Sequence, residues 1–86
     1  MSGVVMYTTS WCPYCARARQ LFAAKEVAFT EIDVEQVSGS RKEMQQRSGR
    51  NTVPQIFIGG QHVGGYDEAH ALDLRGELDP LLAAVS

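Results

Sequence analysis

The apolar residues of this chain follow two different periods, which divide the first part of the sequence into strands and a helix. Residues 4–8 form a nearly continuous apolar run rich in β-branched side chains, which is typical of a strand buried on both faces. In residues 13–25 the apolar positions recur at helical spacing, and residues 28–34 return to a strand-like pattern. A strand, a crossover helix and a second strand predict a right-handed unit with parallel strands.

A second, shorter helix is predicted to begin near Ser40. We expect Ser40 to be its N-cap, and Glu43, three residues later, to complete a capping box. Gly49 supplies the left-handed residue that ends the helix. Because Val37 and Met44 are the only large apolar residues of this segment, most of the helix is expected to face solvent.

The last third of the chain predicts an antiparallel hairpin followed by helices. Residues 55–58 and 61–64 are the two strands, and two consecutive glycines, residues 59–60, form the turn because glycine tolerates its positive φ angles. A helix opens within residues 64–67, and Gly76 ends it.

A final helical segment is predicted to begin with Asp79 as N-cap and Pro80 as its first helical residue, where proline loses no hydrogen bond. The predicted order is therefore β-α-β-α-β-β-α with a last helical turn or two. This order is an α/β fold, a four-stranded mixed sheet with helices on both faces. Eighty-six residues are enough for a single domain, residues 1–86, around one core.

Composition and charge argue against several classes of protein. The formal net charge of −2 gives no electrostatic footprint for nucleic acid, and no apolar run reaches the length of a membrane span. The first residues lack the charged and apolar regions of a secretory signal. We therefore expect a cytoplasmic protein, without nucleic-acid or membrane partners, whose thiols are reduced at rest.

Cys12 and Cys15 are the two cysteines of the chain, and they lie where the first strand gives way to the first helix. A Cys-x-x-Cys at such a junction indicates a thioredoxin-like redox site. A thiol attacks a disulfide only as the thiolate, and a free cysteine titrates at about 8.5. Because the first turn of a helix carries unpaired N–H groups and a partial positive charge, it favours the anion at Cys12. Cys12 is therefore the expected nucleophile.

Cys15 lies one turn further into the helix, on the apolar stripe that contains Ala18 and Phe22. A thiol on this stripe is removed from solvent, and burial disfavours the charged form. We expect Cys15 to be more buried and less ionised than Cys12, and therefore to be the resolving thiol.

Three alternatives to a redox site could account for the two thiols. A purely structural disulfide is disfavoured because a bridge that closes so short a loop removes little entropy from the unfolded chain. A structural zinc site needs four ligands, and His62 and His70 are the only histidines, so no metal is expected. Two ordinary core cysteines that happen to be three residues apart remain the third alternative.

Three separated segments of the chain resemble the glutaredoxins, small dithiol oxidoreductases of the thioredoxin fold. The segments are Cys12-Pro13-Tyr14-Cys15, Thr52-Val53-Pro54-Gln55 and Gly64-Gly65-Tyr66-Asp67, in the order and approximate spacing of that family. The resemblance extends over nearly the whole chain and is strongest to the small bacterial dithiol glutaredoxins. It implies a thioredoxin fold, with glutathione as a co-substrate and no metal.

The activity implied by this resemblance is glutathione-dependent thiol–disulfide exchange. Such an enzyme reduces protein–glutathione mixed disulfides and protein disulfides through a nucleophilic and a resolving cysteine, here Cys12 and Cys15. The implied partners are glutathione and glutathionylated or disulfide-containing proteins, and the chain is expected to act as a monomer.

The resemblance also implies a glutathione site. Pro54 would follow a cis peptide bond that sets the Val53 backbone beside Cys12, so that Val53 pairs with the glutathione cysteine like an added strand. Amides at the start of the next helix would hold the γ-glutamyl carboxylate, and the Asp67 side chain would accept from the ammonium group. Arg41 matches the position that reaches the glycine carboxylate. The residues assigned to this site are Tyr14, Arg41, Thr52, Val53, Pro54, Gly65, Tyr66 and Asp67.

Two residues depart from the family pattern. Thr9 stands where many relatives have a lysine that helps to bind a glutathione carboxylate and favours the thiolate. An exposed charge pair contributes only about 0–1 kcal/mol, so we expect weaker binding rather than lost function. Trp11, directly before the first cysteine, is more typical of thioredoxins, and we expect it to offer a contact surface.

Two further functions remain open. One is a dimer bridged by an iron–sulfur cluster held by Cys12 and glutathione, although Pro13 stands where cluster-binding relatives have a smaller, more flexible residue. The second is an electron donor served by thioredoxin reductase without glutathione, and the Gly-Gly-Tyr-Asp segment argues against it.

Overall fold

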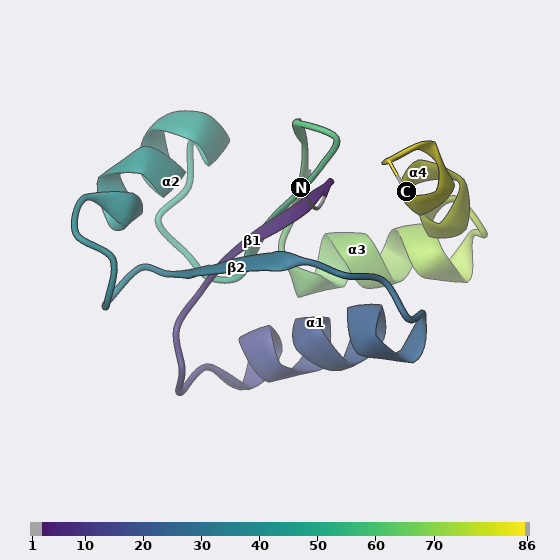
Figure 1. The fold of residues 1–86 in the computed structure, drawn as a ribbon, viewed down its shortest axis with the longest axis horizontal. Helices are drawn as coiled ribbons and strands as arrows, with labels where there is room; N and C mark the ends of the chain where they lie inside the picture. The colour runs from purple at the N-terminus through teal and green to yellow at the C-terminus, as the bar shows by residue number, and fades with distance from the viewer. Residues whose placement is uncertain (1–2, 86) are drawn as a thin grey trace.

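A four-stranded mixed sheet forms the centre of the protein (Figure 1). The computed structural model describes residues 3–85. The elements are β1 (Val4–Thr8), α1 (Pro13–Ala24), β2 (Thr30–Asp33), α2 (Ser40–Ser48), β3 (Gln55–Ile58), β4 (Gln61–Gly64), α3 (Tyr66–Leu74) and α4 (Leu78–Val85). The strand order is β2-β1-β3-β4, with β1 parallel to β2 and the remaining pairs antiparallel. The predicted order of elements and the mixed sheet are confirmed.

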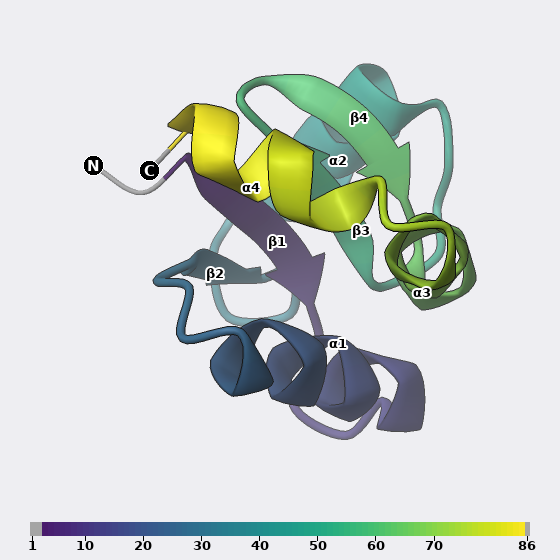
Figure 2. The same cartoon turned by 90° about the vertical axis from the view of Figure 1, so that its right-hand side faces the viewer.

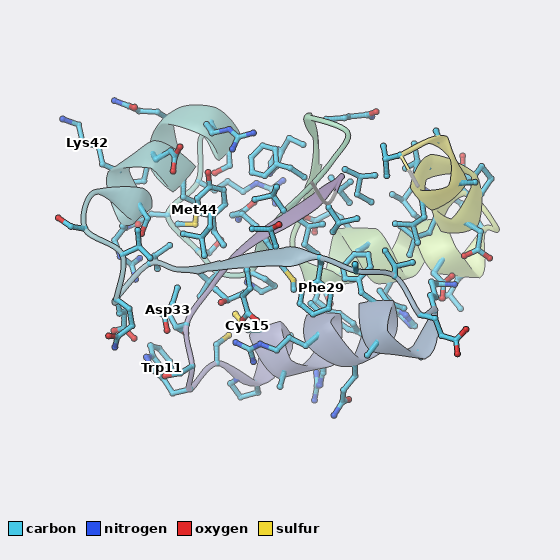
Figure 3. The ribbon with its side chains drawn as sticks, viewed as in Figure 1. Trp11, Cys15, Phe29, Asp33, Lys42 and Met44 are labelled. Atoms are coloured by element: carbon cyan, nitrogen blue, oxygen red, sulfur yellow. The ribbon has the colours of Figure 1, made fainter. Side chains whose placement is uncertain are left out.

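The sheet is buried on both faces, as Figures 1 and 2 show: α2 lies on one face, and α1 and α3 lie on the opposite face. Alternate residues of β1 serve the two faces, because successive strand side chains point in opposite directions. Met6 packs with Phe22 of α1, whereas Tyr7 packs with Met44 of α2. In Figure 3 Met44 points from α2 toward the sheet. One central strand thus joins two apolar clusters.

The second strand is shorter than its apolar pattern predicted, since β2 begins at Thr30 rather than at residue 28. The ladder with β1 begins where Val5 faces Thr30. Phe29 instead packs on Phe22, with 6.0 Å between the ring centroids. The β-branched pattern of residues 28–34 therefore includes a core contact that precedes the strand.

The predicted capping box of α2 is wrong. Ser40 is the first helical residue, and the N-cap is Gly39, which has a φ of 79°. The Ser40 hydroxyl lies inside the helix and donates backward to the Val37 carbonyl at 2.6 Å, so it does not cap the helix. The predicted end of the helix is confirmed, since Gly49 is left-handed and donates to the Gln45 carbonyl at 2.9 Å.

The start of the last helix also differs from the prediction. α4 begins at Leu78, which is completely buried, so Asp79 lies in the first helical turn instead of capping it. The Asp79 carboxylate accepts from Lys25 Nζ at 2.8 Å, and Asp73 of α3 is 2.7 Å from the same nitrogen. The helix therefore begins two residues before the predicted Pro80, with Leu78 packed in the core and Asp79 held by Lys25.

Candidate active site

The two cysteines occupy the junction between β1 and α1. Cys12 is the N-cap of α1, Pro13 is its first residue, and Cys12 is 8% exposed. Cys15 is completely buried, and Figure 3 shows it turned from α1 toward the sheet. Both thiols are free. Cys12 is therefore the less buried of the two cysteines, as the sequence predicts.

The Cys15 thiol is held largely in its protonated form. Burial is the main cause that raises its pKa from 9.0 to about 11, and the neighbouring Cys12 adds to the increase. A backbone hydrogen bond from Thr9 and the charge of Arg19 act in the opposite direction. The prediction that Cys15 is more buried than Cys12 is confirmed, and this burial opposes ionisation of the Cys15 thiol.

The segment before β3 lies against Cys12. The Val53–Pro54 peptide bond is cis, as the resemblance implied. The Cys12 thiol points at the Val53 carbonyl oxygen, with 3.7 Å between sulfur and oxygen. The structure thus brings together two segments that are about forty residues apart in the sequence.

A polar chain behind this segment holds it in place, and the sequence did not reveal it. Gln55 is almost fully buried, and its Nε2 donates to the carbonyl oxygen and the hydroxyl of Thr52 at 3.0 and 3.1 Å. Its Oε1 lies 2.7 Å from Nε2 of His62. His62 lies on β4 and is half-buried against Phe57. In the sequence, the only sign of this network is the glutamine directly after Pro54.

An open pocket lies beside Cys12, between α1, the segment before β3 and the start of α3. It includes every residue that the resemblance assigned to the glutathione site except Arg41. The lining residues are Tyr14, Arg50, Thr52, Val53, Pro54, Gln55, Gly65, Tyr66, Asp67 and Glu68. Arg41 instead donates to the Asn51 side chain at 3.2 Å.

Arg50 and Glu68 form one wall of this pocket, and the sequence pattern assigned neither to it. They form an ion pair, and Glu68 Oε1 also accepts from the Gly65 N–H at 2.9 Å. The Gly65 hydrogen bond, followed by Arg50, lowers the pKa of Glu68. The Gly65 amide at the start of α3 is therefore not free, because Glu68 occupies it.

Exposed aromatic side chains border the dithiol. Trp11 is 69% exposed, and its indole N–H donates to Glu35 at 2.6 Å. Tyr14 is 49% exposed, and the Arg17 guanidinium lies 5.1 Å from its ring centroid. Figure 3 places Trp11 near Asp33 at the outer end of the β1–α1 loop. The surface position expected for Trp11 is confirmed, and its contact role remains a prediction.

The departure at Thr9 has a structural counterpart. Thr9 is completely buried, and its hydroxyl has no hydrogen-bond partner among residues 3–85. Its carbonyl accepts from Arg19 Nη2 at 3.0 Å. The positively charged Arg19 side chain of α1 therefore contacts this loop at Thr9, the position where many relatives have a lysine.

A dithiol at a helix N-terminus, set beside a proline that follows a cis peptide bond in a four-stranded sheet, defines a thiol–disulfide oxidoreductase of the thioredoxin fold. The family model described as glutaredoxin matches residues 4–63. The chain belongs to the glutaredoxin family. It is accordingly a glutathione-dependent disulfide oxidoreductase with a dithiol active site.

Relatives of known sequence and structure support this assignment over the whole domain. Glutaredoxin 3 of Escherichia coli (strain K12) is 54% identical over 82 residues, which cover 95% of this chain and 99% of that protein. A glutaredoxin of Pseudomonas aeruginosa is 52% identical over 84 residues, covering 98% of this chain and all of that protein. The crystal structure of a buckwheat glutaredoxin–glutathione complex is similar with a TM-score of 0.91 and 31% identity, covering 98% of this chain and 79% of that one.

Residues 3–85 contain no membrane-spanning helix and no cluster of three or more metal-ligating side chains. No helix in this range is long and apolar enough to cross a bilayer. Within the same residues, no group of three or more histidine, cysteine, aspartate or glutamate side chains is arranged to hold a metal ion.

Proposed function

We propose that the chain reduces glutathionylated proteins and protein disulfides with Cys12 as nucleophile and Cys15 as resolving thiol, and that glutathione is its co-substrate. The observation that carries this assignment is the position of the Cys12 sulfur. It lies at the N-terminus of α1 and 3.7 Å from a carbonyl oxygen of the pocket wall. Cys15 lies behind it and is shielded from a substrate disulfide.

Reduction of a glutathionylated protein needs only Cys12 among the two cysteines. The Cys12 thiolate attacks the glutathione sulfur, a Cys12–glutathione disulfide forms, and the protein sulfur leaves as a thiolate that takes up a proton. A second glutathione thiolate then attacks the glutathione sulfur of this intermediate. Glutathione disulfide is released, and Cys12 returns to the thiolate.

Reduction of a protein disulfide uses both cysteines. The Cys12 thiolate first forms a mixed disulfide with one substrate sulfur and releases its partner sulfur. The Cys15 thiolate then attacks the Cys12 sulfur, which closes the Cys12–Cys15 bond and releases the second substrate sulfur as a thiolate. Two glutathione molecules supply the electrons that reopen this bond.

The pocket beside Cys12 is the proposed glutathione site. The Val53 backbone would pair with the glutathione cysteine, the first turn of α3 with Tyr66 would face the γ-glutamyl carboxylate, and Asp67 would accept from its ammonium group. Thr52 and Tyr14 line the same pocket. The buckwheat glutaredoxin was solved in complex with glutathione, which supports a tripeptide site in this fold.

Of the two arginines considered for the glutathione site, Arg50 has more structural support than Arg41. Arg50 lines the pocket, although Glu68 partly neutralises it. Arg41 lies outside the lining and contacts Asn51. A role for Arg41 at the glycine carboxylate therefore requires its guanidinium to leave Asn51, and we expect it to contribute less than Asp67.

A coupled assay with a glutathionylated protein and with a protein disulfide tests the assignment. Cys12→Ser is expected to abolish both activities, because no second thiol reaches the substrate. Cys15→Ser is expected to retain deglutathionylation and to lose reduction of the protein disulfide. Equal loss of both activities in the two variants would contradict the assigned roles.

A further inference from the structure

Arg19 lies one helical turn after Cys15, on the same side of α1. Its guanidinium is fixed at two points. Nη2 donates to the Thr9 carbonyl at 3.0 Å, and Nε donates to Glu31 Oε2 of β2 at 2.6 Å. Only 29% of the Arg19 side chain and 31% of the Glu31 side chain are exposed. Arg19 is thus a partly buried, oriented cation.

The groups around Arg19 form a network that reaches back to the buried thiol. The Thr8 hydroxyl donates to Glu31 Oε2 at 2.7 Å, so β1 fixes the carboxylate that holds Arg19. Thr9, whose carbonyl Arg19 binds, also donates a backbone hydrogen bond to Cys15. Arg19 therefore holds the residue that contacts the resolving sulfur. Cys12 lies on the same β1–α1 loop, three residues later.

We propose that Arg19 is a positioning residue for the resolving step: it holds the Thr9 backbone, which contacts Cys15, and keeps a fixed positive charge one helical turn along α1 from the thiol that must ionise. The proposal rests on the roles proposed above for the two cysteines. Glu31 and Thr8 act through Arg19, by fixing the direction of its guanidinium.

The step concerned is the attack of Cys15 on a mixed disulfide at Cys12. The Cys15 thiol releases its proton to solvent, and its thiolate attacks the Cys12 sulfur. The Cys12–Cys15 bond forms, the bond between Cys12 and the substrate sulfur breaks, and the substrate leaves as a thiolate that takes up a proton. Cys15 is oxidised and the leaving sulfur is reduced, so no further reactant is needed.

When Cys12 is part of a mixed disulfide, fewer groups oppose ionisation of Cys15 than in the reduced protein, so the favourable effect of Arg19 matters more. In the reduced protein, Cys12 opposes ionisation of Cys15 through its hydrogen bond and its charge. A Cys12 sulfur in a mixed disulfide carries no charge and no proton, so both effects disappear. Burial then opposes the thiolate, while Arg19 and the Thr9 backbone favour it. Glu31 is the acidic group paired with Arg19 and moderates its effect.

The test follows a single turnover with glutathione disulfide. Reduced protein is mixed rapidly with it and quenched with acid, and mass spectrometry follows the Cys12–glutathione adduct as it converts to the Cys12–Cys15 disulfide. We expect Arg19→Gln to slow this conversion about fivefold at neutral pH and to shift its pH profile upward, since each pKa unit changes the thiolate fraction about tenfold. Arg19→Lys, which keeps the charge but loses the two-point contact, is expected to fall between.

The matched control is Arg75→Gln. It removes an arginine from the exposed Arg75–Glu77 ion pair, outside the pocket beside Cys12, and is expected to resolve at the wild-type rate. Thermal unfolding checks that each variant is folded. Should Arg19→Gln fail to fold, Arg19→Lys makes the test against wild type, because it keeps the charge and loses the two-point contact, and a resolution slower than wild type is again expected.

A second arm separates this proposal from the proposed function. In a Cys15→Ser background, Arg19→Gln is expected to leave deglutathionylation unchanged. Failure of Cys15→Ser itself to turn over a glutathionylated protein would refute the cysteine assignment, whatever Arg19 does. Unchanged resolution in Arg19→Gln, or equal slowing of resolution and of deglutathionylation, would overturn the role of Arg19.

Discussion

The two sides of the active site are built in different ways. On the cysteine side, Cys15 and the two threonines that precede the dithiol are completely buried, and a partly buried arginine holds the loop. On the pocket side, Asp67 and Glu68 are exposed, and the wall is an ion pair in contact with solvent. The reacting sulfurs are fixed by packing, whereas the proposed ligand contacts lie on an adjustable surface.

The packed cysteine side carries out sulfur exchange, and the exposed pocket side is proposed to bind glutathione. Sulfur exchange needs sulfur atoms at fixed positions, and close packing provides them because buried side chains have few alternative rotamers. A pocket that exchanges glutathione on every turnover needs groups that desolvate and resolvate readily. Substitutions on the cysteine side should therefore affect stability and ionisation, and substitutions on the pocket side should affect binding.

Phe22→Ala is expected to have the largest effect. Phe22 is completely buried behind Cys15 on the same face of α1, and truncation of a buried phenylalanine costs about 3–5 kcal/mol. Urea unfolding followed by circular dichroism measures the loss. Leu74→Ala is the matched control, since Leu74 is 75% exposed and its truncation is expected to change stability by less than about 0.5 kcal/mol. Similar losses in the two variants would refute the packing argument.

The cysteine side could be predicted from the sequence more fully than the pocket side. Cys12, Pro13 and the apolar spacing of α1 are local signals, so the burial of Cys15 followed from its position on the apolar stripe. The contact between Glu68 and Arg50 joins the start of α3 to the segment after α2, and no local pattern encodes it. The network of Arg19 was missed for the same reason, because Glu31 lies on a different element.

The starts of two helices also differ from the prediction. Ser40 and Asp79 both have the residue type of an N-cap, and capping preference depends on a side chain that is free to accept. Ser40 donates to Val37, and Asp79 binds Lys25. A local hydrogen bond to Val37 and a long-range ion pair with Lys25 thus engage two polar side chains that the sequence assigns to caps.

The second prediction concerns the ionisation of the two thiols. Burial raises the pKa of Cys15 to about 11, so its thiolate fraction at neutral pH is about a hundredfold lower than that of a thiol at 9.0. Iodoacetamide at neutral pH is therefore expected to modify Cys12 of the reduced protein and to leave Cys15 largely unmodified, with modification of Cys15 increasing as the pH is raised. Peptide mapping by mass spectrometry measures both sites. Modification of Cys15 at neutral pH would contradict its burial.

The third prediction concerns the pocket. Asp67→Asn is expected to raise KM for glutathione about fivefold with little change in kcat, because an exposed charge-assisted contact is worth roughly 1 kcal/mol. Arg41→Gln is expected to change KM by less than about twofold, since the Arg41 guanidinium contacts Asn51 and lies outside the pocket lining. Steady-state kinetics with a glutathionylated peptide measures both. A larger effect of Arg41 would reverse their proposed order.

The smallest expected effect is a pH-dependent contribution of Glu68 to stability. The Gly65 N–H, and then Arg50, lower the pKa of Glu68 in the folded protein below the value of about 4.3 that it has when unfolded. A group with a lowered folded pKa stabilises the protein above its unfolded pKa, and the contribution is lost as the pH falls through the folded pKa. Wild type should therefore exceed Glu68→Gln in urea midpoint at pH 7, by far less than it exceeds Phe22→Ala, because Glu68 is exposed.

This difference in midpoint should shrink as the pH falls below about 4.3 and vanish once both states are protonated. Glu77→Gln is the control, because Glu77 belongs to the exposed pair with Arg75 and such pairs contribute little. A midpoint difference for Glu68→Gln that stays constant from neutral to acidic pH would mean that the side chain stabilises α3 without its charge. In that case the pocket wall would be held by packing, as the cysteine side is, and the contrast between the two sides would be lost.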